Sequence, residues 1–190
     1  MTDLRGYLKQ TPSILGGFQY IALHGPATSS DWEVTMRQLS DVAAQTILFH
    51  ADTLPPRSLL LELGDRAAIE NMDHLKADGR TLQEMSIIMD QFPEAQIVID
   101  VAHAHQIDDS DRLLRDLVSS FSDRIAHYHL SKLDSQARHL PLNQQDLQWI
   151  ETLPIRNAPW VWEECPSVSS QFLASYLKQL QQEPLAANNI

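Results

Sequence analysis

The chain has 190 residues, of which 43% are hydrophobic and 21% charged, and its formal net charge is −11. This length and composition are typical of one globular domain, which we expect over residues 1–190. The acidic balance argues against a nucleic-acid surface, because binding to phosphates requires clustered positive charge. No apolar run reaches the ~18 residues of a membrane span or resembles a signal peptide. With Cys165 as its one cysteine, the chain can form no intrachain disulfide, and we expect a cytoplasmic protein.

Short apolar segments alternate with segments of helical period, which predicts an α/β fold with a parallel sheet. The predicted strands are 18–24, 46–50, 67–71, 96–100, 124–129 and 160–164. The predicted helices are 31–44, 81–92, 110–121, 143–153 and 169–181, with one more helix expected in 1–17 and a polar tail at the carboxyl end. Thr81 and Glu84 have the spacing of a capping box, which supports a helix start at this point.

Each predicted strand has a histidine or a carboxylate at its last or next-to-last position. These residues are His24, His50, Glu70, Asp100, His129 and Glu163. Parallel strands of a barrel bring their carboxyl ends to one face, so the six side chains are expected to converge. A divalent cation between them would relieve the repulsion of their charges, and a set of His and carboxylate ligands suits Zn, Mn, Fe or Co. Such a metal could polarise a substrate carbonyl or acidify a bound water.

At these positions the sequence resembles a known superfamily. The segments are LHGPA (23–27), LFHAD (48–52), IENMD (69–73), IDVAHA (99–104), HYHLS (127–131), RHLPL (138–142) and VWEE (161–164). They are similar, in the same order, to the strand-end motifs of the xylose-isomerase-like TIM-barrel superfamily. That group contains sugar isomerases and epimerases as well as the endonuclease IV type of DNA-repair phosphoesterase. The resemblance extends from about residue 18 to residue 165 and implies a TIM-type barrel.

The resemblance also implies roles for individual residues. In the isomerases and epimerases, one divalent metal (Mn, Zn, Co or Mg, with Mn or Zn preferred here) is held by the residues that correspond to Glu70, Asp100, His129 and Glu163. The two glutamates, Glu70 and Glu163, would move a proton between adjacent carbons of a sugar or polyol. His103 would contact a substrate oxygen. In the phosphoesterase branch three zinc ions are bound, and His24, His50, His103 and His139 would supply further ligands. His127 shares a strand face with His129 and is a further candidate.

Three departures from the superfamily pattern shape the prediction. Ala137 stands where an Asp-x-His pair with His139 would place its carboxylate, although Asp134 lies nearby. Lys132 replaces an aspartate that many members carry. A closed barrel needs eight strands, whereas we predict six, so we expect an incomplete barrel of about six parallel strands with outer helices. Its open edges could be covered by a homo-oligomer, which we favour, by the amino-terminal segment or by another partner.

The sequence therefore predicts a divalent-metal-dependent isomerase or epimerase acting on a sugar or polyol. The alternatives are a metal-dependent phosphoesterase and a catalytically degenerate barrel that binds a metabolite or partner. Simpler roles also exist for the candidates: Asp100 could cap a helix, Glu70 could pair with a basic side chain, and His24 and His50 could be structural. Glu164 competes with Glu163 for the inward position. We expect His74 and His105 to be surface residues.

Overall fold

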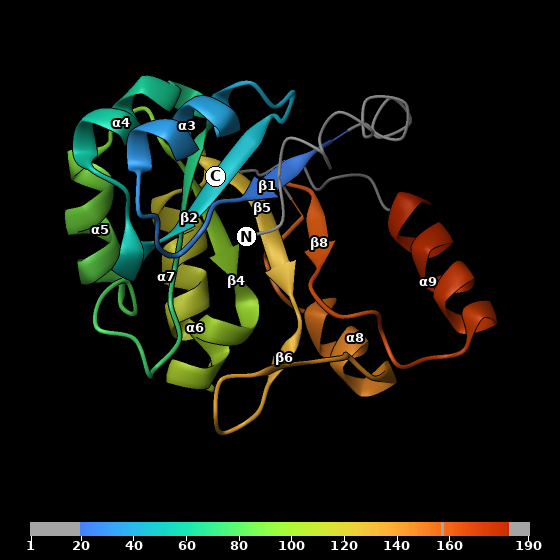
Figure 1. Cartoon of the computed structure of the whole chain (residues 1–190). Coiled ribbons are helices and arrows are strands. Elements are labelled where there is room, and N and C mark those ends of the chain that lie inside the picture. Colours follow the sequence, from blue (N-terminus) through green and yellow to red (C-terminus); the bar gives the residue numbers. More distant parts are fainter. Residues whose placement is uncertain (1–19, 157, 183–190) are drawn as a thin grey trace.

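The computed structural model describes residues 20–156 and 158–182, and a six-stranded parallel sheet lies at its centre (Figure 1). The strands pair in chain order, β1-β2-β3-β4-β5-β8, each with the next. Their bounds are Ala22–His24 (β1), Thr46–His50 (β2), Ala67–Glu70 (β3), Gln96–Asp100 (β4), Ile125–Leu130 (β5) and Trp160–Trp162 (β8). The predicted α/β class and incomplete TIM-type barrel of six parallel strands are confirmed. The helix expected in 1–17 lies outside the described residues.

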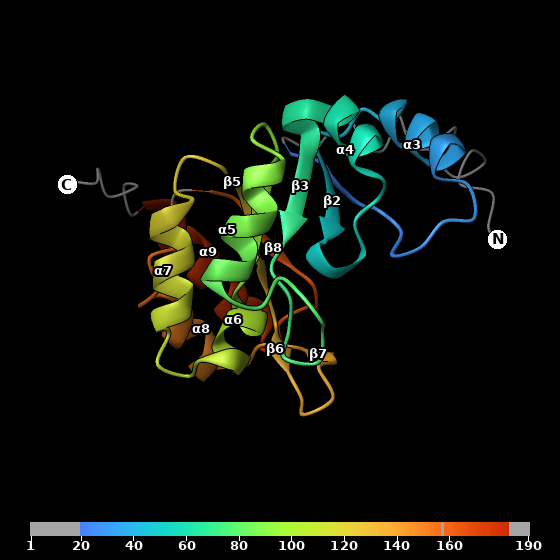
Figure 2. The same ribbon diagram turned by 90° about the vertical axis from the view of Figure 1, so that its left-hand side faces the viewer.

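Helices connect successive strands, as a parallel sheet requires. They are α3 (Trp32–Ser40), α4 (Arg57–Leu63), α5 (Leu82–Gln91), α6 (Val101–Ile107), α7 (Arg112–Ser120), α8 (Gln144–Ile150) and α9 (Ser170–Gln182), with short 3₁₀ turns at Ala51–Thr53 and Gly64–Arg66. Helices α3 to α7 lie along one side of the sheet, and α9 lies beyond β8 (Figures 1 and 2). The capping box of Thr81 and Glu84 opens α5 as predicted. The sequence did not predict α4 and α6.

The main core lies between the sheet and these helices. Alternate strand residues face it, because successive side chains of a strand point to opposite sides. Ile47, Phe49, Ile69, Ile97 and Ile99 from the central strands are at most 1% exposed, and they belong to the same buried cluster as helical Leu60, Met85, Met89, Leu114 and Leu117. The opposite face of the sheet has a smaller cluster of Leu48, Ala68, Val98 and Ala126.

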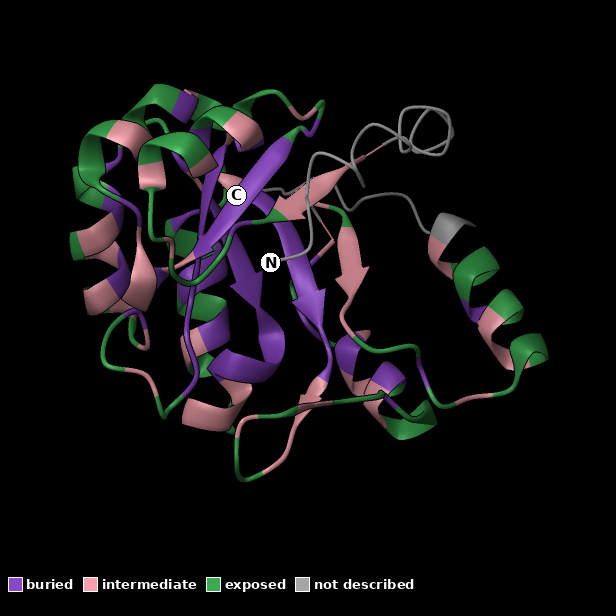
Figure 3. Ribbon diagram, viewed as in Figure 1, coloured by how far each residue is buried: buried purple, intermediate pink, exposed green. Residues whose placement is uncertain are grey.

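The central and outer strands differ in burial. Strands β2 to β5 are almost wholly buried, whereas every residue of β1 and β8 is intermediate or exposed (Figure 3). Within the described parts of the chain, β1 and β8 each pair with one strand only, and so the sheet has two edges. None of the helices in these parts is long and apolar enough to cross a membrane.

A short antiparallel hairpin follows β5 and was not predicted. It pairs β6 (Lys132–Leu133) with β7 (His139–Leu140). Asp134 forms the turn, because its carboxylate accepts hydrogen bonds from the backbone N–H groups of Gln136 and Arg138. Ala137 has a φ of +54°, in the left-handed region. The hairpin returns the chain to the carboxyl end of β5 and brings His139 beside Ser131.

Candidate metal centre

The register of the sheet brings the strand ends together. His50 lies opposite Glu70 in the β2–β3 pair, and Asp100 lies opposite His129 in the β4–β5 pair. Two residues earlier, Leu48, Ala68 and Val98 form the small cluster on the same face, since side chains alternate along a strand. The polar strand ends therefore form a layer above a small apolar layer inside the half-barrel.

Four residues form the centre of this layer: Glu70, Asp100, His129 and Glu163. Each can present a ligand atom, and the four atoms all lie within 4.8 Å of one another. The Nδ1 atom of His129 lies 2.7 Å from Glu70 Oε1 and 3.3 Å from Glu163 Oε1. Glu70 and Asp100 are at most 1% exposed and His129 is 4% exposed. Two buried carboxylates and the partly exposed carboxylate of Glu163 thus surround one buried imidazole, an arrangement that needs a positive charge between them.

Asp100 is both a helix cap and a candidate ligand. Its Oδ1 atom accepts a hydrogen bond of 2.8 Å from the backbone N–H of His103, at the start of α6. Its Oδ2 atom is buried and has no hydrogen-bond partner among the described residues. The Asn71 side chain holds the same residue from β3, because it accepts from the Asp100 N–H and donates to the Asp100 carbonyl. An unpartnered buried oxygen, aimed at two other carboxylates and an imidazole, fits a divalent cation.

The pKa shifts at the centre reflect this shared burial. Burial, with the charges of Glu163 and Glu70, raises the pKa of Asp100 to about 7. Burial alone would lower the pKa of His129, but its hydrogen bonds to Glu163 and Glu70 raise that pKa to about 10. Burial opposes ionisation of both glutamates, yet the hydrogen bond and charge of His129 lower the pKa of Glu70 and of Glu163 below their usual range. The imidazolium of His129 therefore supplies the balancing charge in the metal-free protein.

Two further groups flank the centre and share ligands with it. In one, the Nε2 atom of His50 lies 3.6 Å from Glu70 Oε2 and 3.0 Å from His24 Nε2. In the other, the Nε2 atom of His103 lies 3.7 Å from Asp100 Oδ2, with His139 completing the group. Within each group the ligand atoms again lie within 4.8 Å of one another. The geometry therefore provides three adjoining positions for cations.

Two histidines of these groups donate a hydrogen bond to a backbone carbonyl. The Nδ1–H of His24 donates to the Gly25 carbonyl, and that of His103 donates to the Asn71 carbonyl. Gly25 is required beside His24, because a Cβ at this position would lie 2.3 Å from the Phe49 ring. The Nδ1 atom of His50 is buried without a hydrogen-bond partner among the described residues, and burial lowers the pKa of this histidine.

All nine predicted site residues lie at this face or directly beneath it. Glu70, Asp100, His129 and Glu163 form the centre, His24, His50, His103 and His139 form the flanking groups, and His127 contacts His129 from below. Glu163 joins the centre, whereas Glu164 is exposed. Among the described residues, the ion-pair partners of Glu70 are His24, His50 and His129, and neither a lysine nor an arginine pairs with it.

Asp134 and His105 lie outside the three groups. Asp134 pairs with Arg138 in the hairpin and does not replace the carboxylate missing at Ala137. His105 lies on α6 with 40% of its side chain exposed, as expected of a surface residue, and its Nδ1 atom lies 2.8 Å from Asp111 Oδ1.

Three residues of the site escaped the sequence analysis. Asn71 joins the ends of β3 and β4, as described above. The Ser131 hydroxyl lies 2.7 Å from His139 Nδ1 and 3.4 Å from Glu163 Oε2. The Tyr20 hydroxyl lies 2.8 Å from His127 Nδ1. Asn71 and Ser131 each directly follow a strand, where the other site residues also lie. This position in the sequence could have identified both of them as site residues. No sequence pattern indicated Tyr20, because its hydrogen-bond partner, His127, lies 107 residues away.

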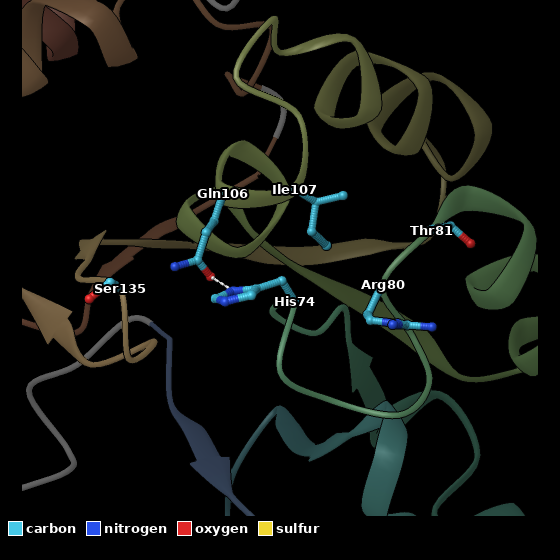
Figure 4. Close-up of a pocket in the computed structure, with 6 residues that line it drawn as sticks. All are labelled: His74, Arg80, Thr81, Gln106, Ile107 and Ser135. Carbon is cyan, nitrogen blue, oxygen red and sulfur yellow. Dashed lines mark hydrogen bonds between the residues drawn. The ribbon is translucent and has the colours of Figure 1, made fainter.

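A pocket of about 590 Å³ is lined by the loop that follows β3, the carboxyl end of α6 and the turn of the β6–β7 hairpin (Figure 4). The side chains of His74 and Gln106 meet in it, with His74 Nδ1 2.6 Å from Gln106 Oε1. Gln106 is one helical turn after His103 on α6, and His74 is four residues after Glu70. The lining residues are His74, Arg80, Thr81, Gln106, Ile107 and Ser135. They offer hydrogen-bonding groups and one cation to a polar molecule, and none of the nine candidate site residues is among them.

Comparison with known proteins supports the fold. No protein-family model matches the sequence, and no curated protein matches it. Endonuclease IV from Thermus thermophilus aligns over 84% of this chain and 74% of its own, with a TM-score of 0.56 and 15% identity. The 3-keto-D-glucoside 4-epimerase YcjR from E. coli aligns over 93% and 84%, with a TM-score of 0.55 and 14% identity.

The probable 3-DHS dehydratase AsbF from Bacillus anthracis aligns over 97% of this chain and 84% of its own, with a TM-score of 0.56 and 13% identity. At these identities the likeness concerns the fold. The resemblance predicted from the strand-end motifs is confirmed at that level: the chain has the fold of the xylose-isomerase-like TIM barrels in an incomplete form.

Proposed function

We propose that this protein is a divalent-metal-dependent isomerase or epimerase that acts on a small sugar or polyol. The observation that carries the proposal is the buried group of Glu70, Asp100, His129 and Glu163, with its unpartnered Asp100 oxygen. A bound Mn or Zn ion would polarise a carbonyl or hydroxyl of the substrate. Glu70, Asp100, His129 and Glu163 would hold that ion, in the donor set expected from the superfamily resemblance.

The two glutamates carry the proton transfer in this proposal. Glu70 and Glu163 approach His129 Nδ1 with one oxygen each, so they stand beside the same point of the site. One carboxylate removes a proton from a substrate carbon, and the other returns one to the neighbouring carbon or to the opposite face. Polar groups of the pocket on the loop after β3, such as Gln106 and His74, would bind hydroxyls of a substrate large enough to extend from the centre to this pocket.

Metal content tests the first part of the proposal. The purified protein is expected to retain a divalent ion through gel filtration, and elemental analysis measures it. Glu70→Ala and Asp100→Ala are expected to lose the ion. A metal-free wild-type protein, unchanged in its affinity for Mn²⁺ and Zn²⁺ by these substitutions, would contradict the proposal.

Proton transfer tests the second part. Aldoses, ketoses and polyol-derived ketones are incubated in D₂O with the metal-loaded protein, and NMR detects deuterium at carbons next to the carbonyl. Glu163→Gln, assayed at a metal concentration at which elemental analysis shows the centre occupied, is expected to abolish this exchange. Glu164→Gln is the matched control, because it changes the exposed neighbour by the same atoms. Equal exchange in both variants would remove Glu163 from the mechanism.

The same experiments separate the proposal from the two alternatives. Three tightly bound ions per chain, with hydrolysis of phosphodiesters, would favour a phosphoesterase, which the three adjoining groups could hold. That interpretation is weakened by Ala137, which leaves the third group without its expected second carboxylate. A protein that binds sugars without metal and without exchange would be a degenerate barrel with a binding role.

We also propose that two copies of the chain associate over the open edge of the barrel. The supporting observations are the single-sided pairing of β1 and β8 among the described residues and their partial exposure. An unpaired edge tends to associate with another chain unless it is covered. Sedimentation equilibrium is expected to give twice the chain mass, and a monomer at high concentration would contradict this.

A further inference from the structure

A chain of hydrogen bonds leads from the candidate metal centre into the interior of the half-barrel. The Nε2 atoms of His129 and His127 are 3.0 Å apart. The Nδ1 atom of His127 is 2.8 Å from the Tyr20 hydroxyl, and that hydroxyl is 2.7 Å from Thr46 Oγ1. His127 lies on β5, Tyr20 precedes β1 and Thr46 begins β2. These hydrogen bonds therefore cross the interior of the half-barrel from β5 to the segment before β1 and the start of β2.

The position of His129 dictates the direction of every hydrogen bond in this chain. His129 turns Nδ1 toward Glu70 and Glu163, so binding a cation through Nδ1 requires the hydrogen of the neutral ring to be on Nε2. That N–H donates to His127 Nε2, which must then be bare. His127 consequently carries its hydrogen on Nδ1 and donates it to the Tyr20 oxygen. The Tyr20 hydroxyl in turn donates to Thr46.

We infer that His127 and Tyr20 are positioning residues for His129, which they hold in the tautomer and ring orientation that leave Nδ1 free to bind the metal. The inference rests on the proposed metal centre and assigns no chemistry to either residue. Metal-bound histidines in proteins generally donate their second N–H to a fixed acceptor. His24 and His103 use backbone carbonyls for this purpose. His129 instead depends on a side chain, which mutation can remove.

Burial makes the arrangement specific. His127 is 0% exposed and Thr46 is 1% exposed. A buried polar group without a partner is costly, and a buried network is stable when every member is satisfied. Each nitrogen of His127 has one partner, and the Tyr20 hydroxyl has two. With a cation on Nδ1 and the hydrogen of His129 on Nε2, the other tautomer of His127 would place two N–H groups face to face at the His127–His129 contact, so the metal-bound network favours one tautomer.

Zn²⁺ affinity, measured at neutral pH by competition with a chromophoric chelator, tests the inference. His127→Phe keeps a ring and removes both nitrogens, and we expect about 10–100-fold weaker binding. His127→Gln places an amide oxygen where Nε2 was and is expected to bind within about threefold of the wild type. Tyr20→Phe removes only the distal hydroxyl and is expected to weaken binding less than His127→Phe. Tyr176→Phe is the control, because it also removes a hydroxyl, one that donates to the Leu147 carbonyl far from the site.

A second measurement separates positioning from a merely structural role. In the ¹⁵N-labelled, Zn²⁺-loaded wild type, long-range ¹H–¹⁵N spectra of the histidines are expected to show His129 protonated at Nε2 and His127 at Nδ1. In Tyr20→Phe, His127 is expected to populate both tautomers. Circular dichroism confirms that each variant is folded. If His127→Phe is unstable, the contrast between Tyr20→Phe and Tyr176→Phe decides the question.

The outcomes also separate this inference from the proposed function. A wild-type protein that does not bind Zn²⁺ overturns the metal centre and the inference together. A wild type that binds Zn²⁺, with equal affinity in His127→Phe and Tyr20→Phe and an unchanged His129 tautomer, overturns the inference alone. Loss of affinity in His127→Phe with no recovery in His127→Gln assigns His127 to packing and also overturns it.

Discussion

The central and outer strands hold their site residues in different ways. Glu70, Asp100 and His129 belong to the buried strands β3, β4 and β5 and are at most 4% exposed. His24 ends β1 with a side chain that is 46% exposed, and Glu163 follows β8 with one that is 22% exposed. The site therefore combines a buried half, built by the middle of the sheet, with a half open to solvent at its edges.

The hydrogen bonds that fix the site residues also differ between the buried half and the open half. Asp100 is fixed by the cap of α6 and by the two hydrogen bonds of Asn71, and His129 is fixed by His127. His24 has its own neighbour, the Gly25 carbonyl, as its fixed acceptor. Charge in the buried half is costly without compensation, whereas water screens it at the edges. Substitutions in the buried half should therefore change metal binding most.

The largest expected effect is that of Asp100→Asn. The asparagine retains the helix cap of α6 but removes the charge that holds the metal, so we expect Zn²⁺ binding at the centre to be lost in calorimetric titration. The metal-free variant should be more stable than the wild type above neutral pH, because it removes a buried carboxylate that lacks a partner on Oδ2. Its thermal midpoint should rise by about 2–4 °C or more.

Asp116→Asn is the matched control for this prediction. Asp116 is an exposed carboxylate on α7, paired with Arg112 at 3.7 Å, and its loss should leave both Zn²⁺ affinity and the thermal midpoint unchanged. Undiminished Zn²⁺ binding in Asp100→Asn would show that the buried half does not dominate the site.

The next largest effect is the pH dependence of metal affinity. The pKa of Asp100 is raised to about 7 and that of His129 to about 10, so both residues bind protons that a metal must displace. Affinity should therefore rise with pH, by about two protons per ion below pH 7 and about one above it. Zn²⁺ titrations in buffers of different ionisation enthalpy measure the protons released. Affinity independent of pH would contradict the placement of these two ligands.

The metal-free protein should show the opposite trend in stability. The folded-state pKa of Asp100 lies above its unfolded value, so the folded protein binds this proton more tightly, and stability falls as pH rises from about 4 to 7. The raised pKa of His129 contributes stability that is complete below about pH 6.5 and is lost as pH approaches 10. Urea unfolding of the chelator-treated protein across this range measures both trends.

A moderate effect is expected where the site departs from the superfamily pattern. Ala137 lies two residues before His139 with a φ of +54°, a conformation that aspartate and asparagine adopt more readily than alanine. Ala137→Asp should fold well and strengthen Zn²⁺ binding at the group of Asp100, His103 and His139 by about tenfold or more. Ala137→Asn has the same backbone preference without the charge. Equal affinities in the two variants would show that the hairpin holds residue 137 away from the site.

The sequence predicted the strand ends because two features coincide there: an apolar run stops, and a histidine or carboxylate follows. Strands β2 and β4 have the predicted bounds, since a run of β-branched and apolar residues stops abruptly at His50 and Asp100. The first and last strands are shorter than predicted, at Ala22–His24 and Trp160–Trp162. In the sequence, the apolar residues that flank a short edge strand look like part of the strand. Only the hydrogen-bonded pairing with the neighbouring strand shows where the edge strand begins and ends.

The sequence analysis failed where one residue has two functions or where contacts are distant. Asp100 was treated as either a helix cap or a ligand, but its two oxygens allow both, and α6 begins directly after it. The β6–β7 hairpin was missed because each strand has only two residues. The link from Tyr20 to His127 depends on the curvature of the sheet, which no local pattern records.

The smallest expected effect belongs to the open half of the site. His24→Ala removes a ligand of the group formed with His50 and Glu70 but leaves the four central ligands in place. Zn²⁺ affinity at the centre should change by less than about threefold, because an exposed imidazole contributes little to a neighbouring buried charge. Any ion in the flanking group should be lost, which elemental analysis would register as one ion fewer per chain. His74→Ala, an exposed histidine outside the three groups, is the control. A loss at His24 as large as that of Asp100→Asn would mean that the three positions fill together, and that the edge strand stabilises the centre as strongly as the middle of the sheet does.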